Sequence, residues 1–187
     1  MKIDKNDVLN SILNNLSKID YIKPGDIPNI PLYMDQVLLF MSDVFDLFEN
    51  DEASPVLTSS MINNYVKNGL VEHPDHKKYT REHLAKIVMI GMLKQVLPIQ
   101  DIAVLFSESA DTREMFEAFT HAQDTALHET VEAIKNTESD PTVLHATALR
   151  LVAEANARRA VAEQLLRSLS PAQKDAEAKP KKNPKNK

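Results

Sequence analysis

Residues 57–106 read LTSSMINNYVKNGLVEHPDHKKYTREHLAKIVMIGMLKQVLPIQDIAVLF, and the fold is decided by this stretch. It predicts a helix over residues 59–68, with Thr58 as its N-cap and Gly69 in a left-handed conformation after its last turn. A short turn with two adjacent lysines follows, and then a longer helix that ends before Pro98. Proline suits the first turn of a helix, so another helix is expected directly after it. The stretch is therefore typical of a small helical domain.

The rest of the chain shows the same helical periodicity, because apolar residues recur at three- and four-residue steps. In all, the predicted helices cover residues 7–19, 33–48, 59–68, 80–97, 99–106, 111–136 and 142–169. Asp140 and Pro141 separate the last two helices, which we expect to fold back on each other as an antiparallel hairpin. The chain from residue 171 onwards has no periodicity and is rich in Lys and Pro, so it should be disordered.

These elements predict an all-α protein in four parts. The parts are an N-terminal helix and linker (residues 1–28), a central domain (29–107), a C-terminal helical hairpin (108–170) and a disordered Lys-rich tail (171–187). The glycine content supports this fold class, since the chain has only three where average usage would give about 13. Few positions can then adopt positive φ, which disfavours a turn-rich β fold.

Composition predicts a cytoplasmic protein. The chain has no cysteine, which excludes disulfides, thiolate zinc sites and iron–sulfur clusters. Its N-terminal residues are interrupted by charged and amide side chains, unlike a signal peptide. No apolar run approaches the roughly 18 residues of a membrane span. We therefore expect no membrane partner.

Charge is unevenly distributed along the chain. The net charge is −5, which argues against a broadly basic nucleic-acid coat. Between Thr58 and Gln95, however, six Lys or Arg residues and three Asp or Glu residues give +3. A local basic segment within an acidic protein is what a small DNA-binding surface requires.

The helix predicted over residues 59–68 has the side chains that a DNA-recognition helix needs. Short polar groups reach base edges and cations hold phosphates, and asparagine suits adenine in particular. The candidate DNA-binding residues are Ser59, Ser60, Asn63, Asn64 and Lys67 on the helix, and Lys77, Lys78 and Arg81 in and after the turn. The simpler interpretation of the two sets is an exposed polar helix face and a solvated turn.

Three ordered segments resemble the MerR-like winged helix-turn-helix family. They are MINNYVKNGLV (residues 61–71), HKKYTREHL (76–84) and QVLPIQDI (95–102), and they match the end of the recognition helix, the wing and the turn into a final short helix. More narrowly, residues 30–106 resemble a bacterial MerR-like family, the domain of unknown function 1836. The wing here is shorter than in MerR proteins, about seven residues, and has no glycine.

The resemblance implies a MerR-like winged helix-turn-helix core with a minimal wing, and a sequence-specific DNA-binding protein that regulates transcription. It also implies that Lys77 replaces the wing arginine and that Tyr65 contacts the DNA backbone through its hydroxyl, although a half-buried core tyrosine is an equally good interpretation of Tyr65. MerR-like proteins bind double-stranded DNA as homodimers through C-terminal helices, and the candidate interface residues here are Leu144, Leu151, Leu165 and Leu169. The operator and any effector cannot be read from the sequence. The alternative is a helical protein–protein interaction module that keeps the fold without reading DNA.

Metal binding and catalysis have less support from the sequence. His121, Asp124 and His128 follow one another at steps of three and four, so one helix face could hold a metal. Further ligands could come only from Glu129, Glu132 and His145, and a solvated helix face is the favoured interpretation. The sequence has no glycine-rich phosphate loop and no serine in a nucleophile-elbow context. We therefore expect no cofactor and no enzyme activity.

Overall fold

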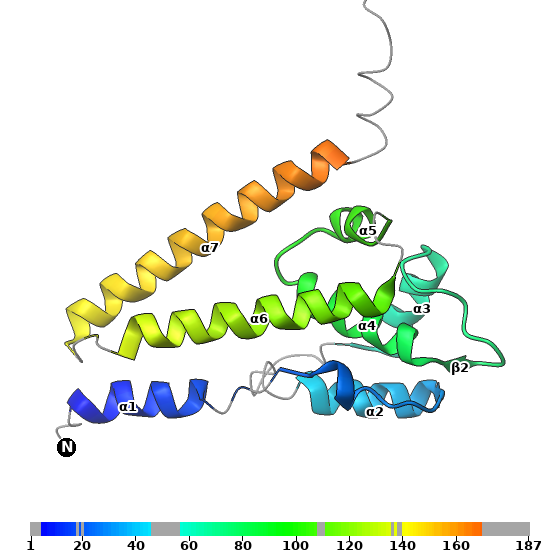
Figure 1. The fold of residues 1–187 in the computed structure, drawn as a ribbon, viewed down its shortest axis with the longest axis horizontal. Helices are drawn as coiled ribbons and strands as arrows, with labels where there is room; N and C mark the ends of the chain where they lie inside the picture. The colour runs from blue at the N-terminus through cyan, green and yellow to red at the C-terminus, as the bar shows by residue number, and fades with distance from the viewer. Residues whose placement is uncertain are drawn as a thin grey trace, which may run out of the picture.

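The computed structural model describes residues 5–17, 19, 21–45, 57–107, 111–135, 137 and 140–169. Within these ranges the chain forms seven α-helices, a 3₁₀ turn and one pair of short strands (Figure 1). The helices are α1 (Lys5–Leu16), α2 (Met34–Phe45), α3 (Ser59–Lys67), α4 (Arg81–Leu93), α5 (Ile99–Ser107), α6 (Thr112–Lys135) and α7 (Pro141–Leu169). The 3₁₀ turn is η1 (Pro24–Asp26), and the strands are β1 (Leu32–Tyr33) and β2 (Lys78–Tyr79). The predicted all-α fold class is confirmed.

The hydrophobic core forms around α4, which is apolar on almost every side. Leu84, Ile87, Val88 and Ile90 of this helix are fully buried, as expected for a helix at the centre of a domain. The surrounding helices α2, α3, α5 and α6 contribute Val37, Met41, Phe45, Ile62, Val66, Ile102, Phe106 and Phe116 to the same core. Full burial of one such side chain contributes about 1.5–3 kcal/mol. Packing against α4 therefore fixes the positions of the helices around it.

Both predicted caps of α3 are present. The Met61 N–H donates to Thr58 Oγ1 at 3.3 Å, which satisfies one of the unpaired amides of the first turn. After the last turn Gly69 has φ +73°, and the Leu70 N–H donates to the Tyr65 carbonyl oxygen at 2.9 Å. This is the bonding pattern of a Schellman motif, which ends the helix and turns the chain toward β2.

Most helix ends lie within a few residues of their predicted positions, and the largest difference is at the end of α4. The prediction extends this helix to residue 97, but it ends at Leu93. The N–H groups of Gln95 and Val96 donate to carbonyl oxygens three residues earlier, so the chain tightens into a 3₁₀-like turn before Pro98. The last residues of the helix predicted over 33–48 lie outside the described residues.

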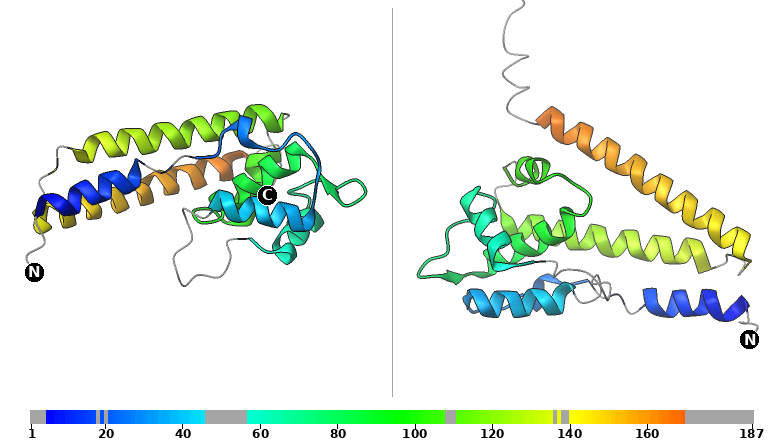
Figure 2. Two further views of the ribbon diagram at one scale, coloured as in Figure 1. Left: turned by 90° about the horizontal axis from the view of Figure 1, so that it is seen from below. Right: turned by 180° about the vertical axis from the view of Figure 1, so that it is seen from behind.

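The helices α6 and α7 do not pack against each other along their length as the predicted hairpin would. α7 begins beside the end of α6, then diverges from it and reaches α5 with its C-terminal part (Figures 1 and 2). The groove between the two helices is lined by four charged residues, Glu129, Arg150, Glu154 and Arg158, and by Thr130, Ala133, Leu151 and Ala155. Among the described residues of α7 only Leu166 is buried.

The two ends of the chain differ in what the structure describes. The N-terminal helix α1 packs against α6 near the end where α6 meets α7, far from α3 (Figure 1). The tail predicted to be disordered, residues 171–187, lies outside the described residues. No described helix combines the length and the apolar character that crossing a bilayer requires.

Candidate nucleic-acid interface

The predicted recognition helix is α3, and it is amphipathic. Ile62, Tyr65 and Val66 pack into the core, while the opposite side, together with Met61, faces solvent. The exposed candidates are Ser60, Asn63, Asn64 and Lys67, and Ser59 is half-buried at the start of the helix. The four exposed residues follow one another at helical spacing, and we call them the polar face of α3. No acidic residue occurs anywhere in this helix.

Tyr65 lies on the buried side of α3 and not on its polar face. Only 8% of the residue is exposed, and burial raises the pKa of its hydroxyl. The reason is helical geometry, because two positions correspond to a rotation of about 200° and place Tyr65 opposite Asn63. The structure gives Tyr65 a packing role, so it does not support the backbone contact that the family resemblance implied.

The basic turn is a tight hairpin at residues 75–78. The Lys78 N–H donates to the Asp75 carbonyl oxygen at 2.8 Å, and the two residues between them, His76 and Lys77, have φ of +48° and +63°. These values are typical of a type I′ turn, in which Asn-Gly is the usual pair. A side chain at positive φ costs about 1–2 kcal/mol. An Asn-Gly pair would therefore be more stable at the two central positions of this turn than the histidine and lysine that occupy them.

Lys78 is held at the base of this turn by an aromatic ring. The strands β1 and β2 are antiparallel, with Tyr33 opposite Lys78. The Lys78 Nζ atom lies 5.3 Å from the centre of the Tyr33 ring, which is a cation–π contact. Asp75 pairs with its neighbour His76 at 2.8 Å, and both side chains are largely exposed. Lys77 makes no ion pair within the described part of the chain and extends from the tip.

Arg81 is engaged inside the protein. Its guanidinium donates to Asn29 Oδ1 and to the Pro24 carbonyl oxygen, and these bonds tie η1 to the first turn of α4. The predicted phosphate contact by Arg81 therefore competes with a structural role. This role could not be predicted from sequence patterns, because both partners lie more than 50 residues earlier in the chain.

Two lysines, one in α4 and one directly after it, change the charge around α3. Lys94 lies beside α3, since its Nζ atom is 4.0 Å from the Met61 sulfur, and burial lowers the pKa of Lys94. This residue was missing from the predicted site, because only the packing of α3 on α4 brings it there. Lys86, in contrast, pairs with Glu72 at 2.5 Å, so it adds little positive charge to the surface.

His83 joins the hairpin to α4. The Thr80 N–H donates to His83 Nδ1 at 2.9 Å, which confirms that α4 begins after Thr80. The His83 ring also packs against the ring of Tyr79, the last residue of β2, in a T-shaped arrangement with the ring centres 5.8 Å apart. Burial lowers the pKa of His83, which favours the neutral ring that can accept the Thr80 bond. These contacts fix the direction in which the hairpin leaves α4.

The candidate metal ligands on α6 remain apart from any further donors. His121, Asp124 and His128 are all exposed. Among the residues that the structure describes, no group of three or more His, Asp or Glu side chains is arranged to hold a metal ion. We therefore assign no role to this helix face.

The comparison with known families was decided by one match. The model of the domain of unknown function DUF1836 matches residues 22–124, which is more than half of the chain. The chain belongs to the DUF1836 family. The match includes η1, both strands, α2 to α5 and the first half of α6, and thus the whole candidate interface. No curated protein and no solved structure matches the chain. The predicted membership in this domain family is confirmed.

Proposed function

We propose that this DUF1836 protein binds double-stranded DNA in a sequence-specific manner, as a MerR-like winged helix-turn-helix regulator of transcription. The observation that carries the proposal is the arrangement of two exposed elements at one end of the molecule. Helix α3 and the hairpin that contains β2 both lie there, opposite the end where α6 meets α7 (Figures 1 and 2). This division of side chains fits readout by a helix and anchoring by a wing.

The polar face of α3 has the chemistry for reading bases in the major groove. The side-chain amide of asparagine can donate a hydrogen bond to N7 of adenine and accept one from its N6 amino group. It must be exposed to do so, and Asn63 and Asn64 are both exposed. Lys67 extends the same face toward the phosphates that flank the groove. Because α3 has no acidic residue, nothing on this helix repels the DNA backbone.

The hairpin supplies the contacts that position the protein without reading sequence. Lys77 and Lys78 are exposed, and the tight turn places both at one end of the hairpin, where they can reach phosphates. Such contacts make binding dependent on salt, because each releases condensed counterions from the DNA.

The first experiment is a selection of duplexes from a random pool by the tagged full-length protein. We expect enrichment of a short motif that contains adenine, and binding to the enriched duplex about a thousandfold tighter than to a scrambled one at physiological salt. A pool that shows no enrichment after repeated rounds at low salt would contradict the proposal.

We further propose that the protein is a homodimer through its C-terminal helices. The support is apolar exposure on α7: Leu149, Val152, Val161 and Leu165 are each between 61% and 67% exposed. Of the candidates from the sequence, Leu165 and Leu169 are exposed, whereas Leu144 and Leu151 are half-buried beside α6. An interface that covers such a helix would bury well over 1,000 Å² in total, as stable dimers do.

The dimer is tested by the pair Val161→Glu with Leu165→Glu. We expect light scattering to give a dimer for the wild type at tens of micromolar and a monomer for this variant. Its helical content should be unchanged, because both side chains face solvent within one chain. The matched control is Asn10→Glu with Asn14→Glu, which adds the same charge at the same four-residue spacing to exposed positions of α1, outside the C-terminal helices. A monomeric wild type would contradict the proposal.

The second candidate function is a protein–protein interaction module without DNA readout. It is favoured by two exposed aliphatic side chains: Ile30 before β1 and Leu39 on α2 are each 67% exposed. Exposed aliphatic side chains of this size are frequent at protein interfaces but are also common singly on protein surfaces. The duplex selection separates the two candidates, since the interaction module enriches no DNA motif.

A further inference from the structure

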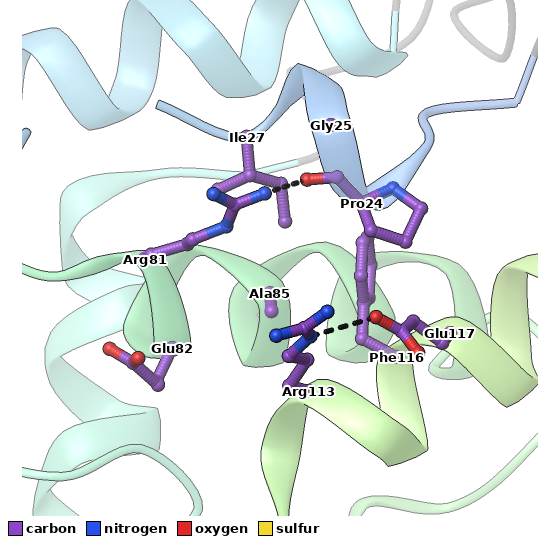
Figure 3. A pocket seen from close by; sticks show the side chains of 9 residues that line it. All are labelled: Pro24, Gly25, Ile27, Arg81, Glu82, Ala85, Arg113, Phe116 and Glu117. Atoms are coloured by element: carbon purple, nitrogen blue, oxygen red, sulfur yellow. Dashed lines mark hydrogen bonds and ion pairs between the residues drawn. The ribbon is translucent and has the colours of Figure 1, made fainter. Parts of the chain in front are cut away.

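A cavity lies between η1, α4 and α6, away from the polar face of α3 (Figure 3). Its volume is about 470 Å³, which is within the range of pockets that hold small organic molecules. Nine residues from the three elements line it: Pro24, Gly25, Ile27, Arg81, Glu82, Ala85, Arg113, Phe116 and Glu117. We call it the Arg81–Arg113 pocket.

The floor of the pocket is apolar. Ile27, Ala85 and Phe116 are exposed by only 2%, 4% and 2%, and they come from the segment after η1, from α4 and from α6. The small side chain of Ala85 leaves room above α4, and Gly25 leaves room on the opposite wall, because a Cβ there would meet nothing within 4 Å. An apolar group of a ligand can therefore be covered from three sides.

The rim of the pocket carries two guanidinium groups, which Figure 3 shows on either side of Ala85. Arg81 donates to two uncharged oxygen atoms, those of Asn29 and Pro24, and no carboxylate of the described residues forms an ion pair with it. Arg113 pairs with Glu117 at 2.9 Å through Nε only. A guanidinium has five N–H donors, so both groups keep donors for a further acceptor.

Two carboxylates, those of Glu82 and Glu117, share the rim with the two guanidinium groups, and each is engaged by a contact of its own. Glu82 accepts a hydrogen bond from the Thr80 hydroxyl at 2.7 Å, and Figure 3 shows its side chain turned away from Arg113. The Arg113–Glu117 pair is on the surface, with the Arg113 side chain 81% exposed. Such exposed pairs are weak and exchange easily with other partners.

We propose that the Arg81–Arg113 pocket binds a small organic carboxylate with an apolar body. The apolar body lies against Ile27, Ala85 and Phe116, and the carboxylate accepts hydrogen bonds from the guanidinium groups of Arg81 and Arg113. A ring or branched alkyl group matches the apolar floor and the Phe116 side chain. The proposal does not depend on DNA binding, since every residue of the pocket lies outside the polar face of α3 and the hairpin tip.

The pocket is tested by calorimetric titration of the full-length protein with naphthalene-1-acetate, phenylacetate and 4-methylpentanoate. We expect at least one to bind with Kd below about 1 mM. The uncharged amide of the same acid keeps the apolar body, and acetate keeps the charge. Each should bind at least about tenfold more weakly than the parent acid, because a charge-assisted hydrogen bond or the apolar burial is lost.

Two substitutions locate the binding site. Ala85→Leu fills the floor and should abolish binding, and Arg113→Gln should weaken it about tenfold. Arg150→Gln is the matched control, because Arg150 pairs with Glu154 at 2.9 Å and four-residue spacing, as Arg113 does with Glu117. It should bind like the wild type. If Ala85→Leu fails to fold, Gly25→Leu fills the pocket from the open side and replaces it.

Three results would overturn the proposal. One is no binding by any of the three acids up to about 10 mM. Another is equal binding of the acid and its amide, which would leave no role for the guanidinium groups. The third is unchanged binding in the folded Ala85→Leu or Gly25→Leu variant, which would place the ligand elsewhere.

Discussion

A variant with Lys77→Ala and Lys78→Ala is expected to bind every DNA duplex more weakly than the wild type, whatever its sequence. Both lysines are exposed in a tight turn at the end of the molecule that carries α3. Phosphate contacts position a protein without specifying bases. Loss of two such contacts should reduce the slope of log K against log salt by about 1–2 units, roughly 0.9 for each contact.

The matched control removes two positive charges elsewhere. Lys135→Ala with Arg150→Ala has the same net charge, and both residues lie toward the end where α6 meets α7 (Figure 1). We expect this control to keep the wild-type slope, because its charges are far from the bound DNA and are screened within about 10 Å at 0.1 M salt. Equal slopes for the hairpin variant and the control would show that Lys77 and Lys78 do not contact phosphates.

The largest effect on stability is expected from Gly91→Ala in α4. A Cβ at this position would lie 2.3 Å from Cζ of Phe45, and also 2.9 Å and 3.1 Å from the two Cε atoms of the same ring. Phe45 is only 1% exposed, so its ring cannot move aside without disturbing the core. Overpacking of this kind costs about 1–3 kcal/mol or more, which outweighs the helix propensity that alanine gains over glycine, about 1 kcal/mol.

Urea denaturation of the variant measures this effect directly. A second substitution, Phe45→Leu, shortens the side chain and should recover part of the stability in the Gly91→Ala background, so the two sites should be strongly coupled in a double-mutant cycle. Gly25→Ala is the control, because a Cβ there meets nothing within 4 Å. A Gly91→Ala variant as stable as the wild type would mean that α2 and α4 are not packed as described.

Local features of the fold could be predicted from the sequence because neighbouring residues determine them. The N-cap Thr58 and the left-handed Gly69 follow from the chemistry of helix ends, and the positions of the helices follow from apolar periodicity. The exposed candidates Asn63, Asn64 and Lys67 were found in the same way, since they lie opposite the apolar face of α3. The same periodicity also places Tyr65 on the buried side of α3.

Features that depend on contacts between distant residues could not be predicted. Arg81 is engaged by Asn29 and Pro24, and Lys94 reaches Met61 only because α3 packs on α4. The type I′ turn at residues 75–78 contains no Asn-Gly pair, so its positive φ values had no sequence signal. The contact of α7 with α5, in place of a close hairpin with α6, also joins elements that apolar periodicity does not relate to each other.

The central claim is that α3 reads DNA bases, and it is tested most directly by Asn63→Ala on a selected and a scrambled duplex. We predict that this variant loses about 1–3 kcal/mol of binding free energy on the selected duplex and keeps the wild-type affinity and salt slope on the scrambled one. Asn15→Ala, which removes an equally exposed asparagine from α1, should match the wild type on both duplexes. If Asn63→Ala binds the selected duplex as tightly as the wild type does, or weakens both duplexes equally, Asn63 on α3 does not read a base.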